Sequence, residues 1–75
     1  MAEWTILTRE GCGWCDKAKA LLKEHDIDFK EIDVNKIDGM RNVIRGFQIS
    51  TVPQVFRDGH RIGGYEDTNR YLEGF

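Results

Sequence analysis

The pattern of apolar and polar positions in the first half of the chain predicts a strand, a helix and a second strand. The apolar, β-prone run Trp4–Thr8 predicts the first strand, which Glu10–Gly13 interrupts. Apolar residues then recur at helical spacing, and one face of the predicted helix carries Trp14, Ala18, Leu21, Leu22 and His25. The run Ile27–Val34 predicts the second strand. A helix between two such strands predicts a right-handed, parallel βαβ unit.

The second half of the chain predicts a helix, a hairpin and a last helix. Apolar residues recur at helical spacing at Ile37, Met40, Val43, Ile44 and Phe47. Val52–Phe56 predicts a third strand, Asp58–Gly59 a two-residue turn, and His60–Gly63 the returning strand. Gly63 and Gly64 precede the last helix, whose inward face would carry Thr68, Tyr71, Leu72 and Phe75. The order β-α-β-α-β-β-α predicts an α/β fold with one mixed four-stranded sheet flanked by three helices.

Length and charge narrow the classes of function. A chain of 75 residues predicts a single domain over 1–75. The net charge of -2 argues against nucleic acid as a partner, because phosphate binding needs a basic surplus on one face. No apolar run approaches the roughly 20 residues that cross a bilayer, and residues 1–7 do not resemble a secretory signal. We therefore expect a cytoplasmic protein that binds no membrane.

The chain has two cysteines, Cys12 and Cys15, which lie three positions apart. A disulfide between them would close so short a loop that it stabilises the fold by only about 2 kcal/mol. Secreted mini-proteins rely instead on several long-range disulfides. In a reducing compartment the pair is therefore better explained by redox chemistry than by structure.

The motif Cys12-Gly13-Trp14-Cys15 stands where the first predicted strand gives way to the helix. Backbone N–H groups and the helix dipole stabilise an anion there, so we expect the pKa of Cys12 to lie below that of a free thiol. Cys12 would attack a substrate disulfide, and Cys15, one turn along and deeper, would resolve the mixed disulfide. A C-x-x-C motif inside a βαβ unit is typical of thioredoxin-like redox proteins.

A zinc site is the structural alternative for the two cysteines. It would need two more ligands, and the two histidines, His25 and His60, do not have the spacing of a zinc finger. We therefore predict no metal ligands within the chain. Pro53 is the only proline, and taken on its residues alone its peptide bond is expected to be trans.

Three segments together resemble the glutaredoxin family over essentially the full chain. They are Thr8–Cys15 (TREGCGWC), Thr51–Phe56 (TVPQVF) and Ile62–Asp67 (IGGYED). The resemblance implies a thioredoxin-like fold and an enzyme that uses glutathione to reduce protein disulfides and glutathione mixed disulfides. We expect this enzyme to be monomeric.

The resemblance also implies a glutathione site, made of Arg9, Trp14, Thr51, Val52, Pro53, Gly64, Tyr65, Glu66 and Asp67. A cis Val52–Pro53 bond would lie against the C-x-x-C motif, and the Val52 backbone would pair with the cysteinyl backbone of glutathione. The N-terminus of the last helix would receive the γ-glutamyl carboxylate, and Asp67 the γ-glutamyl ammonium. Trp14 would form one wall.

Two of these assignments have alternatives that the residues leave open. Arg9 would hold the glycine carboxylate with two parallel hydrogen bonds, or it is only a solvated charge. Glu66 and Asp67 would favour the start of a helix with or without a ligand.

Two departures from the family pattern lead to further hypotheses. Gly13 stands where the family usually has proline, and in related proteins a small residue there accompanies a shared [2Fe-2S] cluster. Such a cluster would take Cys12 from each of two chains and two glutathione thiols. The stretch Gln48–Ser50 lacks the basic residue that the family often carries. This lack favours a redoxin that is reduced by thioredoxin reductase and supplies electrons to ribonucleotide reductase.

Overall fold

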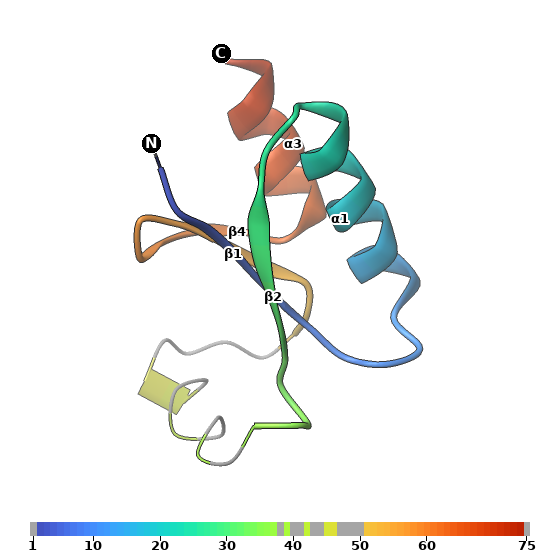
Figure 1. Cartoon of the computed structure of the whole chain (residues 1–75), viewed down its shortest axis with the longest axis vertical. Helices are drawn as coiled ribbons and strands as arrows, with labels where there is room; N and C mark the ends of the chain where they lie inside the picture. The colour runs from blue at the N-terminus through green and yellow to red at the C-terminus, as the bar shows by residue number, and fades with distance from the viewer. Residues whose placement is uncertain (1, 38, 40–41, 43–44, 47–50, 75) are drawn as a thin grey trace.

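The computed structural model describes residues 2–37, 39, 42, 45–46 and 51–74 (Figure 1). Its elements are β1 (Trp4–Thr8), α1 (Gly13–Glu24), β2 (Phe29–Asp33), β3 (Gln54–Arg57), β4 (His60–Gly63) and α3 (Tyr65–Glu73). Their order agrees with the prediction. The prediction of the middle helix depends largely on four residues outside the described part of the chain: Met40, Val43, Ile44 and Phe47. The described residues include the other two predicted helices, α1 and α3.

The four strands form one mixed sheet in the order β2-β1-β3-β4. Strand β1 pairs in parallel with β2 and antiparallel with β3, and β3 pairs antiparallel with β4. The predicted four-stranded mixed sheet is confirmed. Strand β3 begins two residues later than predicted, because Pro53 has no N–H to donate to a ladder. Strand β2 begins only at Phe29, since that residue pairs with Trp4, the first residue of β1.

The helices α1 and α3 run beside each other and pack on one face of the sheet (Figure 1). The core on this face consists of Trp4, Ile6, Ala18, Leu21, Leu22, Val55 and Leu72. A smaller cluster on the other face is built on Leu7 and Phe56. Neighbouring strand residues such as Ile6 and Leu7 separate in this way because side chains alternate across a strand.

The inward helix faces are only partly as predicted. In α1 the ends of the predicted apolar stripe are exposed: the Trp14 side chain is 53% exposed and His25 caps the helix, with its Nδ1 3.0 Å from the Leu21 oxygen. In α3, Thr68 and Leu72 are buried, whereas Tyr71 lies at the surface. Trp14, which the family resemblance assigns to a wall of the site and not to the core, lies in the first turn of α1 and packs on Tyr65. Phe75 lies outside the described residues.

Two turns place the hairpin and the last helix. Asp58 and Gly59 both have positive φ, 51° and 82°, as the predicted two-residue hairpin turn requires. Gly63 has φ of 131°, a conformation open mainly to glycine. A Cβ at Gly63 would lie 2.8 Å from the Cβ of Asp67, so glycine also allows the close approach of α3. Among the described residues, no helix has both the length and the apolar character needed to cross a bilayer.

Replacing Gly63 by alanine should lower the free energy of unfolding by about 1–3 kcal/mol, since alanine is strained at this φ and meets Asp67. The measurement is urea unfolding followed by circular dichroism. Gly13→Ala is the matched control, because its added Cβ meets no atom within 4 Å. Equal stability losses in the two variants would contradict this account of Gly63.

Candidate active site

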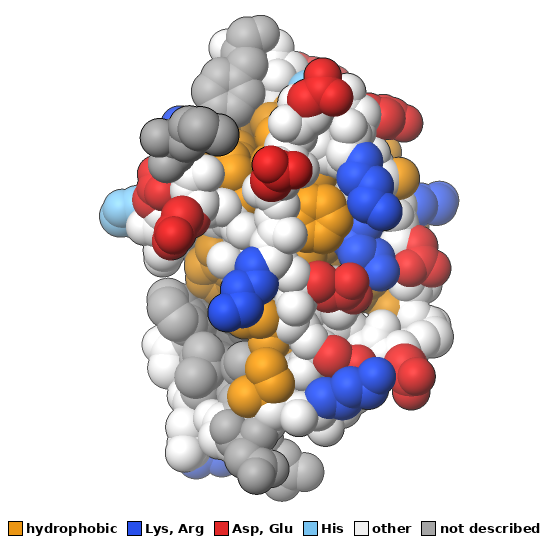
Figure 2. All heavy atoms as spheres, viewed as in Figure 1, with side chains coloured by type: hydrophobic (Ala, Val, Ile, Leu, Met, Phe, Trp, Pro, Cys, Tyr) orange, Lys and Arg blue, Asp and Glu red, His pale blue; other side chains and the backbone are white. Residues whose placement is uncertain are grey.

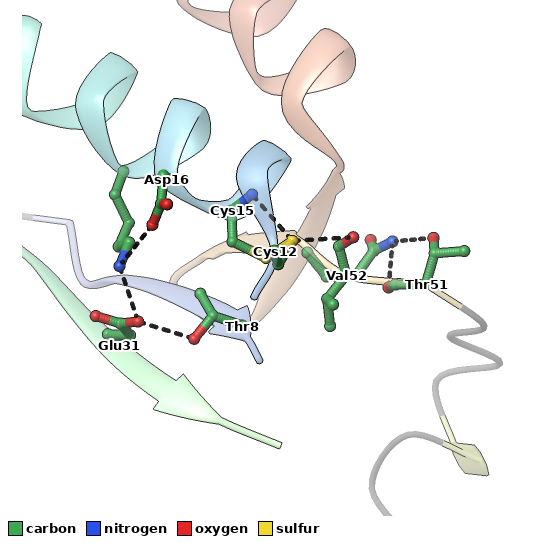
Figure 3. The surroundings of a disulfide bond; sticks show 9 residues. Thr8, Cys12, Cys15, Asp16, Glu31, Thr51 and Val52 are labelled. Carbon is green, nitrogen blue, oxygen red and sulfur yellow. Dashed lines mark hydrogen bonds and ion pairs between the residues drawn. A yellow bond between two sulfur atoms is a disulfide. The ribbon is translucent and has the colours of Figure 1, made fainter. Parts of the chain in front are cut away.

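The two cysteines lie at the turn between β1 and α1 and form a disulfide (Figure 3). Cys12 is the N-cap of α1, in extended backbone conformation, and Cys15 lies in the first turn. Their Cα atoms are 5.2 Å apart. Cys12 is half-buried, whereas Cys15 is only 1% exposed. Of the two sulfur-bearing residues, Cys12 is therefore the one that a substrate can approach.

The sulfur of Cys12 occupies the position of a helix-capping acceptor. The backbone N–H of Cys15 donates to the Cys12 Sγ over 3.1 Å, as an N–H of the first turn normally donates to a capping oxygen. Once the disulfide is reduced, the same N–H and the helix dipole would stabilise a negative charge on this sulfur. The arrangement suits a nucleophilic thiolate at Cys12.

The loop before β3 approaches Cys12 from a distant part of the chain. The Val52–Pro53 peptide bond is cis, so the trans bond expected from the residues alone is wrong and the cis bond implied by the family resemblance is correct. The reason is that the intrinsic trans preference of X-Pro bonds is small, so tertiary packing decides the isomer. Pro53 is buried, and the Val52 carbonyl oxygen lies 3.9 Å from the Cys12 Sγ.

A groove of about 370 Å³ lies beside this loop. Its lining combines three segments far apart in sequence: Trp14, Thr51, Val52, Pro53, Gln54, Gly64, Tyr65, Glu66 and Asp67. The fold thus brings together all the residues of the expected glutathione site except Arg9.

Sequence reasoning missed Gln54 and Lys17 at this groove. Gln54 is 7% exposed, and its Nε2 donates to the Thr51 carbonyl oxygen over 3.1 Å, which ties the loop to β3. The sequence feature that could have pointed to Gln54 is its place as a polar residue inside an apolar strand pattern. The Nζ of Lys17 lies 4.5 Å from the ring centroid of Trp14 and places a cation near the groove. It carried no sequence signal beyond its charge.

The lining of the groove combines two chemically different parts. The rings of Trp14 and Tyr65 lie 5.6 Å apart, tilted by 47°, and form an aromatic wall. The start of α3 at the N-cap Gly64 has no side-chain cap and carries exposed Glu66 and Asp67 in its first turn. A helix N-terminus next to a carboxylate can accept a carboxylate and an ammonium together, as in an amino-acid backbone.

Arg9 lies elsewhere, in a second hollow of about 450 Å³ that also includes Cys12. This hollow is lined by Thr8, Arg9, Glu10, Gly11, Cys12, Asp16, Lys19, Glu31, Asp33 and Lys36. Cys12 lines this hollow. Its sulfur also lies near the carbonyl oxygen of Val52, which lines the groove. The structure does not bring the Arg9 side chain into the lining of the groove.

The lining of this second hollow includes a network of charged side chains, whose contacts are drawn in Figure 3. The Oε2 of Glu31 accepts from the Thr8 hydroxyl over 2.9 Å and from the Lys19 Nζ over 3.1 Å. The Thr8 hydrogen bond, followed by that of Lys19, lowers the pKa of Glu31 below its ordinary value. The hydrogen bond to Glu31 raises the pKa of Lys19. The network joins the end of β1 to β2 and to α1 beneath the cysteine turn.

No group of three or more histidine, cysteine, aspartate or glutamate side chains gathers around a possible metal position in the described part of the chain. An intermolecular cluster, with one cysteine from each of two chains, is a different arrangement and stays a prediction.

Comparisons with known proteins agree with this geometry. The sequence model of the family described as Glutaredoxin matches residues 4–62. Glutaredoxin 3 of Escherichia coli (strain K12) is 38% identical over 68 residues, which cover 89% of this chain and 82% of that protein. The solution structure of a glutaredoxin from Brucella melitensis superposes with a TM-score of 0.80 at 32% identity, covering 99% of this chain and 82% of that one.

A more distant structure shares the fold. The crystal structure of a buckwheat glutaredoxin–glutathione complex superposes with a TM-score of 0.79 at 21% identity, covering 95% of this chain and 69% of that one.

Removing the charge of Glu31 should change the pH dependence of stability. Because its pKa is lowered in the folded state, the carboxylate stabilises the fold above the ordinary value of 4.5, and this contribution is lost as pH falls below it. The difference in unfolding free energy between wild type and Glu31→Gln should therefore be larger at pH 6 than at pH 3. Its size should stay below about 1 kcal/mol, because the ion pair is largely exposed.

Urea unfolding across this pH range measures the effect. Glu24→Gln, which removes the same charge from an exposed position of α1, is the control. Parallel pH profiles for wild type and Glu31→Gln would show that the network does not stabilise the folded state.

Proposed function

The chain belongs to the glutaredoxin family and is a thiol-disulfide oxidoreductase, and from this premise we propose how its residues divide the reaction. Cys12 is the nucleophile, Cys15 is the resolving thiol, and residues 1–75 act as one domain and as a monomer. The observation that carries this assignment is the half-buried Cys12 sulfur at the N-terminus of α1, beside a buried Cys15 and a groove.

The reaction begins with the reduced protein. The Cys12 thiolate attacks one sulfur of a substrate disulfide, a new S–S bond forms, and the other substrate sulfur leaves as a thiolate that takes a proton from water. For a protein disulfide, Cys15 loses its proton and attacks the Cys12 sulfur. This step releases the second substrate thiol and leaves the Cys12–Cys15 disulfide. Two electrons have then passed to the substrate.

Glutathione returns the two electrons. One glutathione thiolate attacks the Cys12–Cys15 disulfide and forms a mixed disulfide with Cys12, and a second glutathione attacks this bond and leaves as oxidised glutathione. For a substrate that is already a glutathione mixed disulfide, Cys12 attacks the glutathione sulfur directly. The second glutathione then completes the cycle without Cys15.

The groove suits the γ-glutamyl and cysteinyl parts of glutathione. The cysteinyl part would lie along the Val52 backbone against Pro53, with Trp14 and Tyr65 as the wall. The γ-glutamyl carboxylate would lie at the N-terminus of α3, with its ammonium on Asp67. A glutathione complex is known for the buckwheat glutaredoxin, which supports glutathione as the ligand of this fold. Arg9 would contribute to the glycine carboxylate only from the neighbouring hollow.

The remaining expectations are proposals about partners and location. We expect a cytoplasmic enzyme whose partners include disulfide-containing proteins, with ribonucleotide reductase as one client. Reduction by thioredoxin reductase remains the alternative, and the stretch Gln48–Ser50 that motivated it lies outside the described residues. The hypothesis of a shared [2Fe-2S] cluster depends on Gly13. An added Cβ at this position would meet no atom within 4 Å.

Cysteine substitutions test the division of roles. With a small glutathione mixed disulfide as substrate and glutathione reductase coupled to NADPH, Cys12→Ser should abolish turnover, while Cys15→Ser should retain part of it. With pre-reduced protein, a protein disulfide as substrate and no glutathione, wild type should complete one full reduction and neither variant should release the fully reduced substrate. A Cys12→Ser variant that keeps full activity would refute the mechanism, and an inactive wild type would shift the proposal to thioredoxin reductase.

Neutralising Asp67 tests the pose of glutathione. Asp67→Asn should raise KM for the glutathione mixed disulfide about fivefold to tenfold and leave kcat nearly unchanged, because the ammonium contact is present before and during the reaction. Steady-state kinetics measures the effect. Glu73→Gln, at the far end of the same helix, is the control. A loss confined to kcat would be inconsistent with this pose.

A further inference from the structure

A third hollow, which the proposed mechanism does not use, lies between the β3–β4 hairpin and α3. Its volume is about 610 Å³, larger than that of the glutathione groove. Its arginine, histidine and aspartate lining residues are Arg57, His60, Arg61, Arg70, Asp58 and Asp67. Three arginines and one histidine thus face two aspartates, although the whole chain carries a net charge of -2.

On the face shown in Figure 2, lysine and arginine side chains are mixed with aspartate and glutamate side chains. Within the hollow, Asp58 already accepts a hydrogen bond on its Oδ1 from the Glu3 N–H over 2.8 Å. We call this hollow, which is lined by three arginines and two aspartates, the basic hollow. Its excess of positive charge favours an anionic ligand.

One arginine of the basic hollow is held in place before any ligand arrives. The Nη1 of Arg57 donates to the Tyr71 hydroxyl over 2.8 Å, and its Cζ lies 5.9 Å from the ring of Trp4. The rings of Trp4 and Tyr71 pack edge to face, with their centroids 6.0 Å apart, and so hold each other in place beside the Arg57 guanidinium. An ordered guanidinium loses little side-chain entropy when it binds an acidic group. Arg61 and Arg70 are exposed, so their guanidinium groups can contact the same acidic ligand.

The basic hollow continues from the glutathione groove. Asp67 lines both, so the two adjoin at this residue, and a chain that extends past Asp67 from the groove would reach the hollow. In the proposed pose the γ-glutamyl end of glutathione, which corresponds to the N-terminal side of its cysteine, lies at Asp67. A polypeptide bound in the same direction would carry the residues before its cysteine into the basic hollow.

We propose that the basic hollow binds acidic residues on the N-terminal side of the reactive cysteine in a protein disulfide substrate. This inference rests on the proposed function, because it uses the groove and its direction. Acidic residues three to five positions before the cysteine are the relevant ones, since that stretch of extended chain spans about 10–17 Å. The hollow would thus select among protein substrates and leave small disulfides unaffected.

Peptide disulfides test the proposal with pre-reduced protein in single turnovers, with released peptide thiol measured after acid quenching. Three symmetrical disulfides of a nine-residue peptide are compared, with aspartates before the cysteine, with the same aspartates after it, and with asparagines in their place. The first peptide should react about fivefold to tenfold faster than the neutral one. This advantage should shrink in 0.5 M NaCl, because salt screens exposed charges.

Charge reversals assign the effect to the basic hollow. Arg61→Glu with Arg70→Glu should remove the advantage of the first peptide. Lys23→Glu with Lys30→Glu is the matched control, because it also alters one last-turn helix residue and one strand residue, and β2 is at the opposite edge of the sheet. This control should keep the advantage. Both double variants should reduce hydroxyethyl disulfide at the wild-type rate, which shows that they fold.

Three results would overturn the inference. They are equal rates for the first and the neutral peptide, an equal advantage for both acidic peptides, and an advantage that survives in Arg61→Glu with Arg70→Glu. Failure of the proposed function looks different, since wild type would then reduce neither the peptides nor hydroxyethyl disulfide.

Discussion

The hydrogen bond from the Cys15 N–H to the Cys12 sulfur is the contact on which the site depends. It exists because α1 begins directly after the turn that ends β1, which makes a sulfur the capping group of the helix. The sheet order then places β3 next to β1, so the loop before β3 comes alongside the same turn. The half-buried Cys12 at the helix N-terminus and the groove beside the Val52 loop are therefore both consequences of where β1 ends.

The groove is built from segments that meet only in the folded chain. Trp14 belongs to the first turn of α1, Val52 and Pro53 to the loop before β3, and Tyr65 and Asp67 to the first turn of α3. Glycine at position 63 lets α3 approach closely enough for Asp67 to reach this place. Small backbone requirements at such positions decide whether a ligand as long as a tripeptide is held at both ends.

Charge is distributed unevenly around Cys12. The network of Glu31, Lys19 and Asp16 holds the turn from one side and carries two carboxylates against one ammonium. The groove ends on the carboxylates of α3, and the basic hollow follows beyond Asp67. In the proposed poses a small ligand would meet only the groove and a polypeptide would meet both, so one reactive sulfur would treat the two classes of substrate differently.

Local patterns were sufficient for the order of the described elements, the hairpin turn at Asp58 and Gly59, and the C-x-x-C motif at a strand-to-helix turn. These features depend on side-chain period and on turn chemistry within a few residues. Contacts between distant segments decided the rest. They selected the cis bond at Pro53, brought Gln54 to the groove and separated Arg9 from it. They also gathered Arg57, Arg61 and Arg70, which no local pattern connects, because their common surface exists only when the hairpin packs beside α3.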